Sequence, residues 1–169
     1  MLQPGSIGFA DMALSTVMPS YARGLDISMA TSSVDNALLL LRNPAGSGIT
    51  IWLYRITLGV TPTNTAAEFK LFGSQTITVN GTTQTAYSRN IGGNFPTASG
   101  LLTSLPTISV NGNLMKTVNI GQNSNSLVLD ERFSFAIQPN NSILITGNPT
   151  SNARNAAITL CWTEVPYGI

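Results

Sequence analysis

The stretch Ile49-Thr-Ile-Trp-Leu-Tyr-Arg-Ile-Thr-Leu58 decides the fold class of this chain. Successive side chains of an extended strand point to opposite faces of a sheet, and here both faces are apolar. One face carries Ile49, Ile51 and Leu53, and the other carries Trp52, Tyr54, Ile56 and Leu58. A strand that is apolar on both sides is buried on both sides. The stretch therefore predicts a β-strand that is central in its sheet or covered by a neighbouring subunit.

From Ala37 onward, short apolar or alternating runs are separated by Gly, Pro and Asn. Runs of this kind are typical of β-sandwiches and barrels. The pattern predicts an all-β fold, an antiparallel β-sandwich of about eight to ten strands. The predicted strands are Ala37 to Arg42, Ile49 to Leu58, Glu68 to Phe72, Gln75 to Val79, Thr83 to Ser88, Thr107 to Val110, Leu114 to Ile120, Ser126 to Leu129, Phe133 to Ile137, Ser142 to Thr146 and Ala156 to Val165.

The last of these runs alternates most clearly. Ile158, Leu160 and Trp162 fall on one face, and Thr159, Cys161 and Thr163 fall on the other. Period-two alternation of this kind indicates a strand with one buried face. We expect it to be the closing strand of the sandwich.

Three breaks between runs carry turn residues. Asn80-Gly81 and Asn111-Gly112 favour the left-handed dihedral angles of a tight two-residue turn, so each predicts an antiparallel hairpin. The third break, Gln138-Pro-Asn-Asn141, contains a proline that cannot donate to a ladder. It predicts a hairpin or a sharp corner.

In two segments the apolar residues follow no regular spacing. Residues 1–36 mix isolated apolar residues with Gly, Pro and a Ser/Thr-rich stretch, and we expect an N-terminal arm or irregular leader. The alternative is an edge strand, or a short helix around Asp11 to Met18. We expect residues 37–169 to form the sandwich domain. Asn90 to Leu105 is irregular as well, and its length is typical of a functional or interface loop.

The composition points to assembly. The chain has 169 residues, enough for one domain, and 43% of them are hydrophobic, but only 9% are charged, against about 25% in an average soluble domain. Ser, Thr and Asn supply the polar surface instead. Scarce charge leaves little repulsion between copies, which favours a permanently assembled protein over the alternative, a secreted neutral domain. The net charge of +1 and scattered Lys and Arg residues argue against nucleic-acid binding.

The residues that usually carry chemistry are scarce. The chain has no histidine, and Cys161 is its one cysteine. The seven Asp and Glu residues are scattered, and the adjacent pair Asp130 and Glu131 would point to opposite faces of a strand. We therefore expect a protein that is not an enzyme and that holds no cofactor or metal. No apolar run approaches the roughly 18 residues of a membrane-spanning helix, so we expect no membrane insertion.

Arg42 and Arg55 are unusual because each ends or interrupts an apolar run. A buried guanidinium needs a partner, so each is a candidate for a contact across a subunit seam, the alternative being that its strand emerges into solvent there. Tyr21, Phe95 and Tyr167 lie outside the best core positions. We expect them to be interface aromatics or, alternatively, residues that stack on sugar rings.

The chain resembles small structural proteins of tailed bacteriophages. The resemblance rests on Ala37 to Arg42, the Asn43-Pro-Ala-Gly-Ser-Gly48 loop, Ile49 to Leu58, Pro139 to Thr146 and Ile158 to Glu164. Within that group it is most similar to capsid decoration, or cement, proteins. The resemblance implies a jelly-roll-like sandwich, assembly as a homotrimer, the major capsid protein as partner, and a location on the outer capsid surface of the virion.

One functional alternative stays open at this point. Fibre and tail modules of phages that bind carbohydrate or receptors share the same β-rich, Ser/Thr/Asn-rich composition. We therefore expect a virion structural protein that bridges and stabilises capsid subunits, with a carbohydrate- or receptor-binding β-sandwich as the alternative.

Overall fold

The computed structural model describes residues 19–31, 34–61, 66–89, 96–121, 126–129, 135–150 and 153–166. Most of these residues are in strands, and every strand pair is antiparallel, which confirms the predicted all-β class. The strands of the described part are β1 (Ser20–Met29), β2 (Asn36–Asn43), β3 (Ile49–Thr61), β4 (Ala67–Gly73), β5 (Thr76–Val79), β6 (Thr82–Gln84), β7 (Tyr87–Ser88), β8 (Leu101–Ser104), β9 (Thr107–Val110), β10 (Asn113–Ile120), β11 (Ser126–Leu129), β12 (Phe135–Ile137), β13 (Asn141–Pro149) and β14 (Arg154–Pro166).

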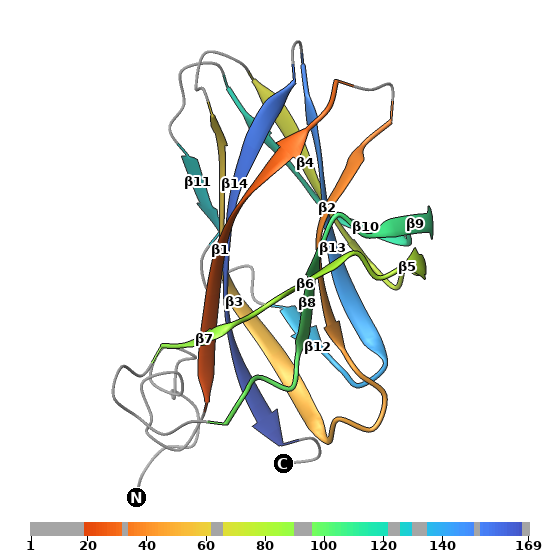
Figure 1. Ribbon diagram of the computed structural model, residues 1–169, viewed down its shortest axis with the longest axis vertical. Coiled ribbons are helices and arrows are strands. Elements are labelled where there is room, and N and C mark those ends of the chain that lie inside the picture. The colour runs from red at the N-terminus through yellow and green to blue at the C-terminus, as the bar shows by residue number, and fades with distance from the viewer. Residues whose placement is uncertain are drawn as a thin grey trace, which may run out of the picture.

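Two sheets face each other and form a β-sandwich (Figure 1). Sheet A has the order β11-β3-β14-β1-β7, with β12 also paired to β3, and sheet B has the order β10-β4-β13-β2-β8-β6. The strands β5 and β9 pair with each other outside both sheets and form a two-stranded ribbon. The antiparallel β-sandwich predicted from the sequence is therefore present.

The chain passes from one sheet to the other at most of its connections. Strands β1, β2, β3 and β4 alternate between sheets A and B, and β12, β13 and β14 do so again. The segment 82–88 crosses one open side of the sandwich, because β6 pairs with β8 in sheet B and β7 pairs with β1 in sheet A (Figure 1). This crossing segment joins the edges of the two sheets.

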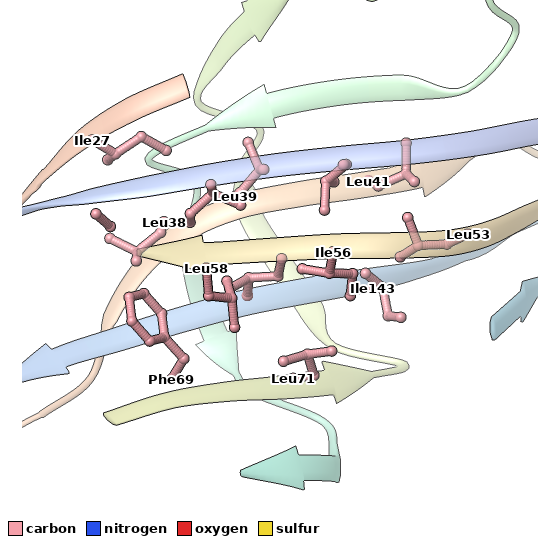
Figure 2. Close-up of a cluster of buried hydrophobic side chains, with 14 of the residues drawn as sticks. Ile27, Leu38, Leu39, Leu41, Leu53, Ile56, Leu58, Phe69, Leu71 and Ile143 are labelled. Carbon is pink, nitrogen blue, oxygen red and sulfur yellow. The ribbon is translucent and has the colours of Figure 1, made fainter. Parts of the chain in front are cut away.

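The hydrophobic core lies between the sheets. Figure 2 shows leucine and isoleucine side chains of β2 and β3 meeting those of β4 and β13. The Tyr21 and Trp162 rings pack within this core, with centroids 5.9 Å apart. Burying one Leu, Ile or Phe side chain stabilises the fold by roughly 1.5–3 kcal/mol, so this core is the main source of stability.

A β-bulge in β3 corrects the predicted faces of this strand. Cys161 lies opposite Arg55, whereas the next residue of β14, Trp162, lies opposite Leu53, so Tyr54 is an extra residue on β3. A bulge of one residue resets the alternation of the strand. Ile56 and Leu58 therefore point into the same core as Leu53 (Figure 2), and the prediction that they lie on the other face is wrong.

Strand β14 has the faces that its alternation predicts. Ile158, Leu160 and Trp162 are buried in the core, with at most 1% of each side chain exposed. The strand does not close an edge, because it pairs with β3 on one side and β1 on the other. Its central place explains why Cys161 and Thr163 on the outward face are buried as well.

The predicted division at residue 36 does not hold. Residues 20–29 form β1, which pairs with β14 from Ser20 opposite Thr163 to Met29 opposite Arg154. Alternation in β1 is hidden in the sequence because Arg23 interrupts the apolar positions Tyr21, Leu25, Ile27 and Met29 that face the core. Residues 1–18 of the predicted arm lie outside the described residues.

The predicted irregular segment from Asn90 to Leu105 also contains a strand. Leu101–Ser104 form β8, which lies between β2 and β6 in sheet B. Only Leu102 of this short strand reaches the core, so it has no repeating apolar pattern. Residues 90–95 lie outside the described residues.

The two Asn-Gly breaks do not form hairpins. Gly81 and Gly112 have φ angles of 79° and 85°, as their turn chemistry predicts. The strands that flank them pair with other partners: β5 with β9, β6 with β8, and β10 with β4. The expected hairpins are wrong because tertiary pairing, rather than the turn, selects the neighbours here.

Buried Asn43 ties two corners of the sandwich together. Its Nδ2 donates to the carbonyls of Ile49 and Ile137, both at 2.8 Å, and its Oδ1 accepts from Ser47 Oγ at 2.6 Å. The break at residues 138–141 is a sharp corner, because β12 belongs to sheet A and β13 to sheet B. Asn43 holds this corner beside the loop that joins β2 to β3.

Candidate functional site

The ribbon of β5 and β9 stands on the outer face of sheet B (Figure 1). Ile77 and Ile108, from its two strands, pack against a small apolar cluster on the outer side of the sheet. The buried members of that cluster are Leu40, Phe72 and Leu144. The ribbon is therefore anchored by its own apolar contacts rather than by sheet hydrogen bonds.

Large apolar side chains are exposed at both ends of the ribbon. At one end Val79 and Leu105 are 58% and 55% exposed, and the backbone of Leu105 lies against Gly81. At the other end Val110, Leu114 and Met115 are 58%, 55% and 45% exposed. We call these five residues the ribbon surface. Val79 and Val110 belong to the ribbon itself, whereas Leu105 precedes β9 and Leu114 and Met115 begin β10. Single exposed apolar residues are ordinary, but several of them on and beside one element are typical of an interaction surface.

A polar hollow lies beside the Val79 end of this surface. It has a volume of about 70 Å3 and is lined by Leu40, Arg42, Asn80, Thr83, Leu101 and Thr103. Arg42 Nη1 donates to Asn80 Oδ1 at 3.2 Å. The register places Leu40 beside Thr103 and Thr103 beside Thr83, so three adjacent strands form its floor.

A second, larger cleft opens near the other end of the ribbon surface. Its volume is about 270 Å3. Met115, Phe135 and Ile143 line the cleft with apolar groups. Its polar residues line it with hydroxyl and amide groups. Those polar residues are Ser74, Gln138, Asn141 and Ser142.

The two arginines singled out in the sequence lie on different sheets. Arg42 lies on the outer face of sheet B, where it lines the polar hollow. Arg55 is exposed on β3 of sheet A, opposite Cys161. The structure therefore places Arg42 next to the ribbon surface and Arg55 away from it.

Tyr21 is not an interface residue, so that expectation is wrong. Its side chain is 1% exposed, and its hydroxyl donates to the carbonyl of Pro96 at 2.9 Å. Burial, together with the nearby Glu164 carboxylate, raises the pKa of Tyr21 to about 12. Tyr21 lies in the core because it belongs to β1. Phe95 and Tyr167 lie outside the described residues.

Glu164 is a buried residue that the sequence reasoning missed. Its carboxylate accepts hydrogen bonds from the backbone N–H groups of Ser99 and Gly100, at 2.9 and 2.8 Å, and from Trp162 Nε1 at 3.3 Å. Three donors satisfy the buried charge and hold the segment before β8 against β14. The signal in the sequence that could have revealed this buried carboxylate is the presence of a glutamate within the apolar Ala156 to Val165 run.

Cys161 lies on the outward face of sheet A but is buried. Burial raises the pKa of its thiol, against the opposing effect of the Arg89 and Arg55 charges. Arg89 donates to the Tyr54 hydroxyl, which also lies 3.1 Å from Ser20 Oγ. Burial outweighs the two arginine charges and favours the protonated thiol, the form that is a poor nucleophile.

Within the described ranges, no three His, Cys, Asp or Glu side chains gather as they would around a metal ion. In that same part of the chain, no helix has the length and apolar character needed to cross a membrane. No protein-family model, curated protein or solved structure matches the chain. The fold and the surface around the ribbon are therefore the basis for proposing a function.

Proposed function

We propose that this chain is a non-enzymatic virion structural protein, a capsid decoration protein that attaches to the outer surface of a bacteriophage capsid. In this role it bridges subunits of the major capsid protein and opposes their separation. The ribbon surface is the single observation that carries the proposal, since it offers exposed apolar side chains on and beside an element that is itself anchored to the sandwich.

The strand order supports this class of protein. The central strands of sheet A follow the order β1-β14-β3-β11, and those of sheet B follow β2-β13-β4-β10. We infer that the sandwich is a jelly roll, since these strands alternate between two sheets with long connections back to the first pair. Jelly rolls occur in viral capsid proteins and lectins, so this order favours both candidate functions over others.

The proposed mechanism is mechanical. A stable contact between proteins buries about 1,200–2,000 Å2, with an apolar centre and a polar rim. When the ribbon surface is covered by two neighbouring capsid subunits, pulling them apart exposes that area to water again. We expect the protein to attach as a homotrimer, so that several ribbons engage one junction.

Co-sedimentation with capsids that lack this protein tests the proposal. The wild-type chain is expected to sediment with them, and the Val79→Ser, Val110→Ser double variant is expected to bind at least tenfold more weakly. Both valines are more than half exposed, so the free energy of unfolding should change by less than about 0.5 kcal/mol for each. Val34→Ser is the matched control, because Val34 is 69% exposed but lies between β1 and β2.

Two outcomes would contradict the proposal. One is a wild-type chain that stays in the supernatant at every capsid concentration, and the other is equal binding by the double variant and the control. Attachment should also persist in about 1 M salt, where the screening length is only about 3 Å, because the contact is largely apolar. Mass measurement of the free protein checks the expected trimer.

The larger cleft favours carbohydrate binding as a second candidate function. It combines the Phe135 ring with hydroxyl and amide groups from Ser74, Gln138 and Asn141, which is the chemistry that sugar sites use. Its volume of about 270 Å3 is close to the lower end of typical ligand sites. A glycan array separates the two functions: selective binding that Gln138→Ala removes would favour a sugar-binding module, whereas a decoration protein binds no glycan selectively.

A further inference from the structure

We propose that the polar hollow beside the ribbon takes the carboxylate of an acidic side chain, Asp or Glu, from the protein to which this chain attaches. The inference rests on the proposed attachment function for the source of the carboxylate. The hollow itself lies on the outer face of sheet B, where β2, β8 and β6 run side by side (Figure 1).

The groups that line the hollow are mainly hydrogen-bond donors. Arg42 uses one N–H on Asn80 Oδ1, which leaves its other guanidinium N–H groups and the Asn80 amide N–H groups for a ligand. No carboxylate lines the hollow, and within the part of the chain that the structure describes none pairs with Arg42. A site that is rich in hydrogen-bond donors and contains an arginine without a paired carboxylate is suited to bind an anion.

Thr103 gives an independent indication. Thr103 lines the hollow and is only 7% exposed. Its hydroxyl Oγ1 is buried without a hydrogen-bond partner. A buried hydroxyl without a partner is rare in folded proteins and costs free energy. Rotation of the Thr103 side chain about χ1 would turn this hydroxyl toward the hollow, where a ligand oxygen would supply the missing partner.

The hollow fits a small planar anion such as a carboxylate. Its volume of about 70 Å3 is enough for a small anion. A carboxylate presents two oxygens in one plane, which matches the fork of a guanidinium. The buried Leu40 forms an apolar floor, and Leu101, at 39% exposed, forms part of an apolar rim.

The position of the hollow identifies the source of the carboxylate. Asn80 directly follows Val79, and the Gly81 position lies against Leu105, so a partner that covers this end of the ribbon surface also covers the hollow. Covering Arg42 removes water from its charge, which is strongly unfavourable unless an opposite charge replaces the water. The covering surface must therefore bring an acid to this point.

Titration of the full chain with sodium acetate, followed by NMR, tests the hollow without any partner. Acetamide is the neutral probe of the same shape, and sodium chloride and inorganic phosphate are the other anions. We expect acetate to shift the methyl signals of Leu101 and Thr103 in a saturable way. Acetamide, sodium chloride and inorganic phosphate should cause no saturable shift. Arg42→Gln, which keeps an amide N–H for Asn80, should weaken acetate binding at least tenfold.

Two further variants test the role of the Thr103 hydroxyl and the need for an arginine at this particular site. Thr103→Val has the same shape without the hydroxyl, so it should weaken acetate binding about 2- to 10-fold, the loss expected for one hydrogen bond. Arg55→Gln, on the other sheet, should leave acetate binding unchanged. Equal shifts with chloride, or with Arg42→Gln, would overturn the carboxylate site, and so would tighter binding of phosphate than of acetate.

Attachment to capsids tests the source. Arg42→Gln should bind capsids at least tenfold more weakly than Arg55→Gln while its thermal unfolding stays that of a folded protein. If acetate binds but Arg42→Gln attaches like the wild type, the partner's acid is not the occupant and the inference fails while the attachment function stands. If the wild type does not attach at all, the proposed function fails and with it the protein source of the carboxylate.

Discussion

The Glu164 carboxylate accepts a hydrogen bond from the backbone N–H of Gly100 at 2.8 Å, at a position where a Cβ would crowd two side chains. A Cβ on Gly100 would lie 2.7 Å from Ile51 Cδ1 and 3.2 Å from Glu164 Oε1. The glycine therefore allows the backbone to approach the carboxylate, and the carboxylate fixes where the segment before β8 enters sheet B.

Replacing Glu164 by Gln should destabilise the fold by about 1–3 kcal/mol. The amide keeps one acceptor oxygen but turns the other into a donor, which then faces the backbone N–H of Ser99 or Gly100. Urea unfolding measures the change. Asp26→Asn is the matched control, since Asp26 is exposed on β1 and should change stability by less than about 0.5 kcal/mol. Equal effects of the two substitutions would show that Glu164 is not an anchor.

Stability should fall between pH 10 and about 12 because of Tyr21. Folding raises its pKa from 10.0 to about 12, through burial first and the Glu164 charge second. The folded protein thus holds the phenol proton more tightly than the unfolded chain, and this stabilisation is complete below pH 10 and is lost as the pH rises through 12. The loss is on the order of 2 kcal/mol.

Chemical unfolding at several alkaline pH values measures this loss. Tyr21→Phe should remove most of the pH dependence in that range, although it lowers stability slightly at neutral pH because the hydrogen bond to Pro96 is gone. Tyr87→Phe, at an exposed position, should keep the pH dependence. A Tyr21→Phe variant with the wild-type alkaline profile would contradict the assignment.

Asn43→Ala should cost about 2–4 kcal/mol. The substitution removes a buried amide and leaves the carbonyls of Ile49 and Ile137 without the donor that serves both. Thermal or urea unfolding gives the magnitude, and Asn119→Ala, at an exposed position on β10, is the comparison. A cost below about 1 kcal/mol would mean that the two corners are held by other contacts.

Gly46 and Gly112 form a matched pair for testing the ribbon junction. Both have left-handed backbone angles, with φ of 72° and 85°, so alanine is strained at either site by about 1 kcal/mol. A Cβ at Gly46 meets no atom within 4 Å, whereas a Cβ at Gly112 would lie 2.2 Å from the Gly73 carbonyl oxygen. Gly112→Ala should therefore be clearly the more destabilising of the two in urea unfolding. Similar costs would show that the backbone near Gly73 shifts freely.

Most strands could be predicted from their apolar runs and the turn residues between them, but β1 and β8 could not. The faces of β14 follow from the spacing of Ile158, Leu160 and Trp162. Strand β1 was hidden because Arg23 breaks the pattern of its core-facing residues, and β8 was hidden because only Leu102 reaches the core. A bulge such as the one at Tyr54 is set by the neighbouring strand, so a single strand's sequence does not reveal it.

The candidate site was only partly predictable for a related reason. Arg42 stood out because it ends an apolar run, but its neighbours Asn80 and Thr103 come from distant segments. Exposed Val79 and Val110 look like ordinary strand residues in the sequence. Their exposure follows from the pairing of β5 with β9 outside both sheets, which is a matter of topology rather than of local pattern.

The central place of β14 has a consequence for how the chain comes to be folded. Strands β1 and β3 do not pair with each other, and each reaches the rest of sheet A through β14, which follows all the other described strands in the sequence. Sheet A thus cannot assemble progressively during translation, and an emerging chain holds β1 and β3 with unpaired edges until β14 leaves the ribosome. Such long-range pairing makes folding slow, and the waiting edges are where newly made copies would associate wrongly.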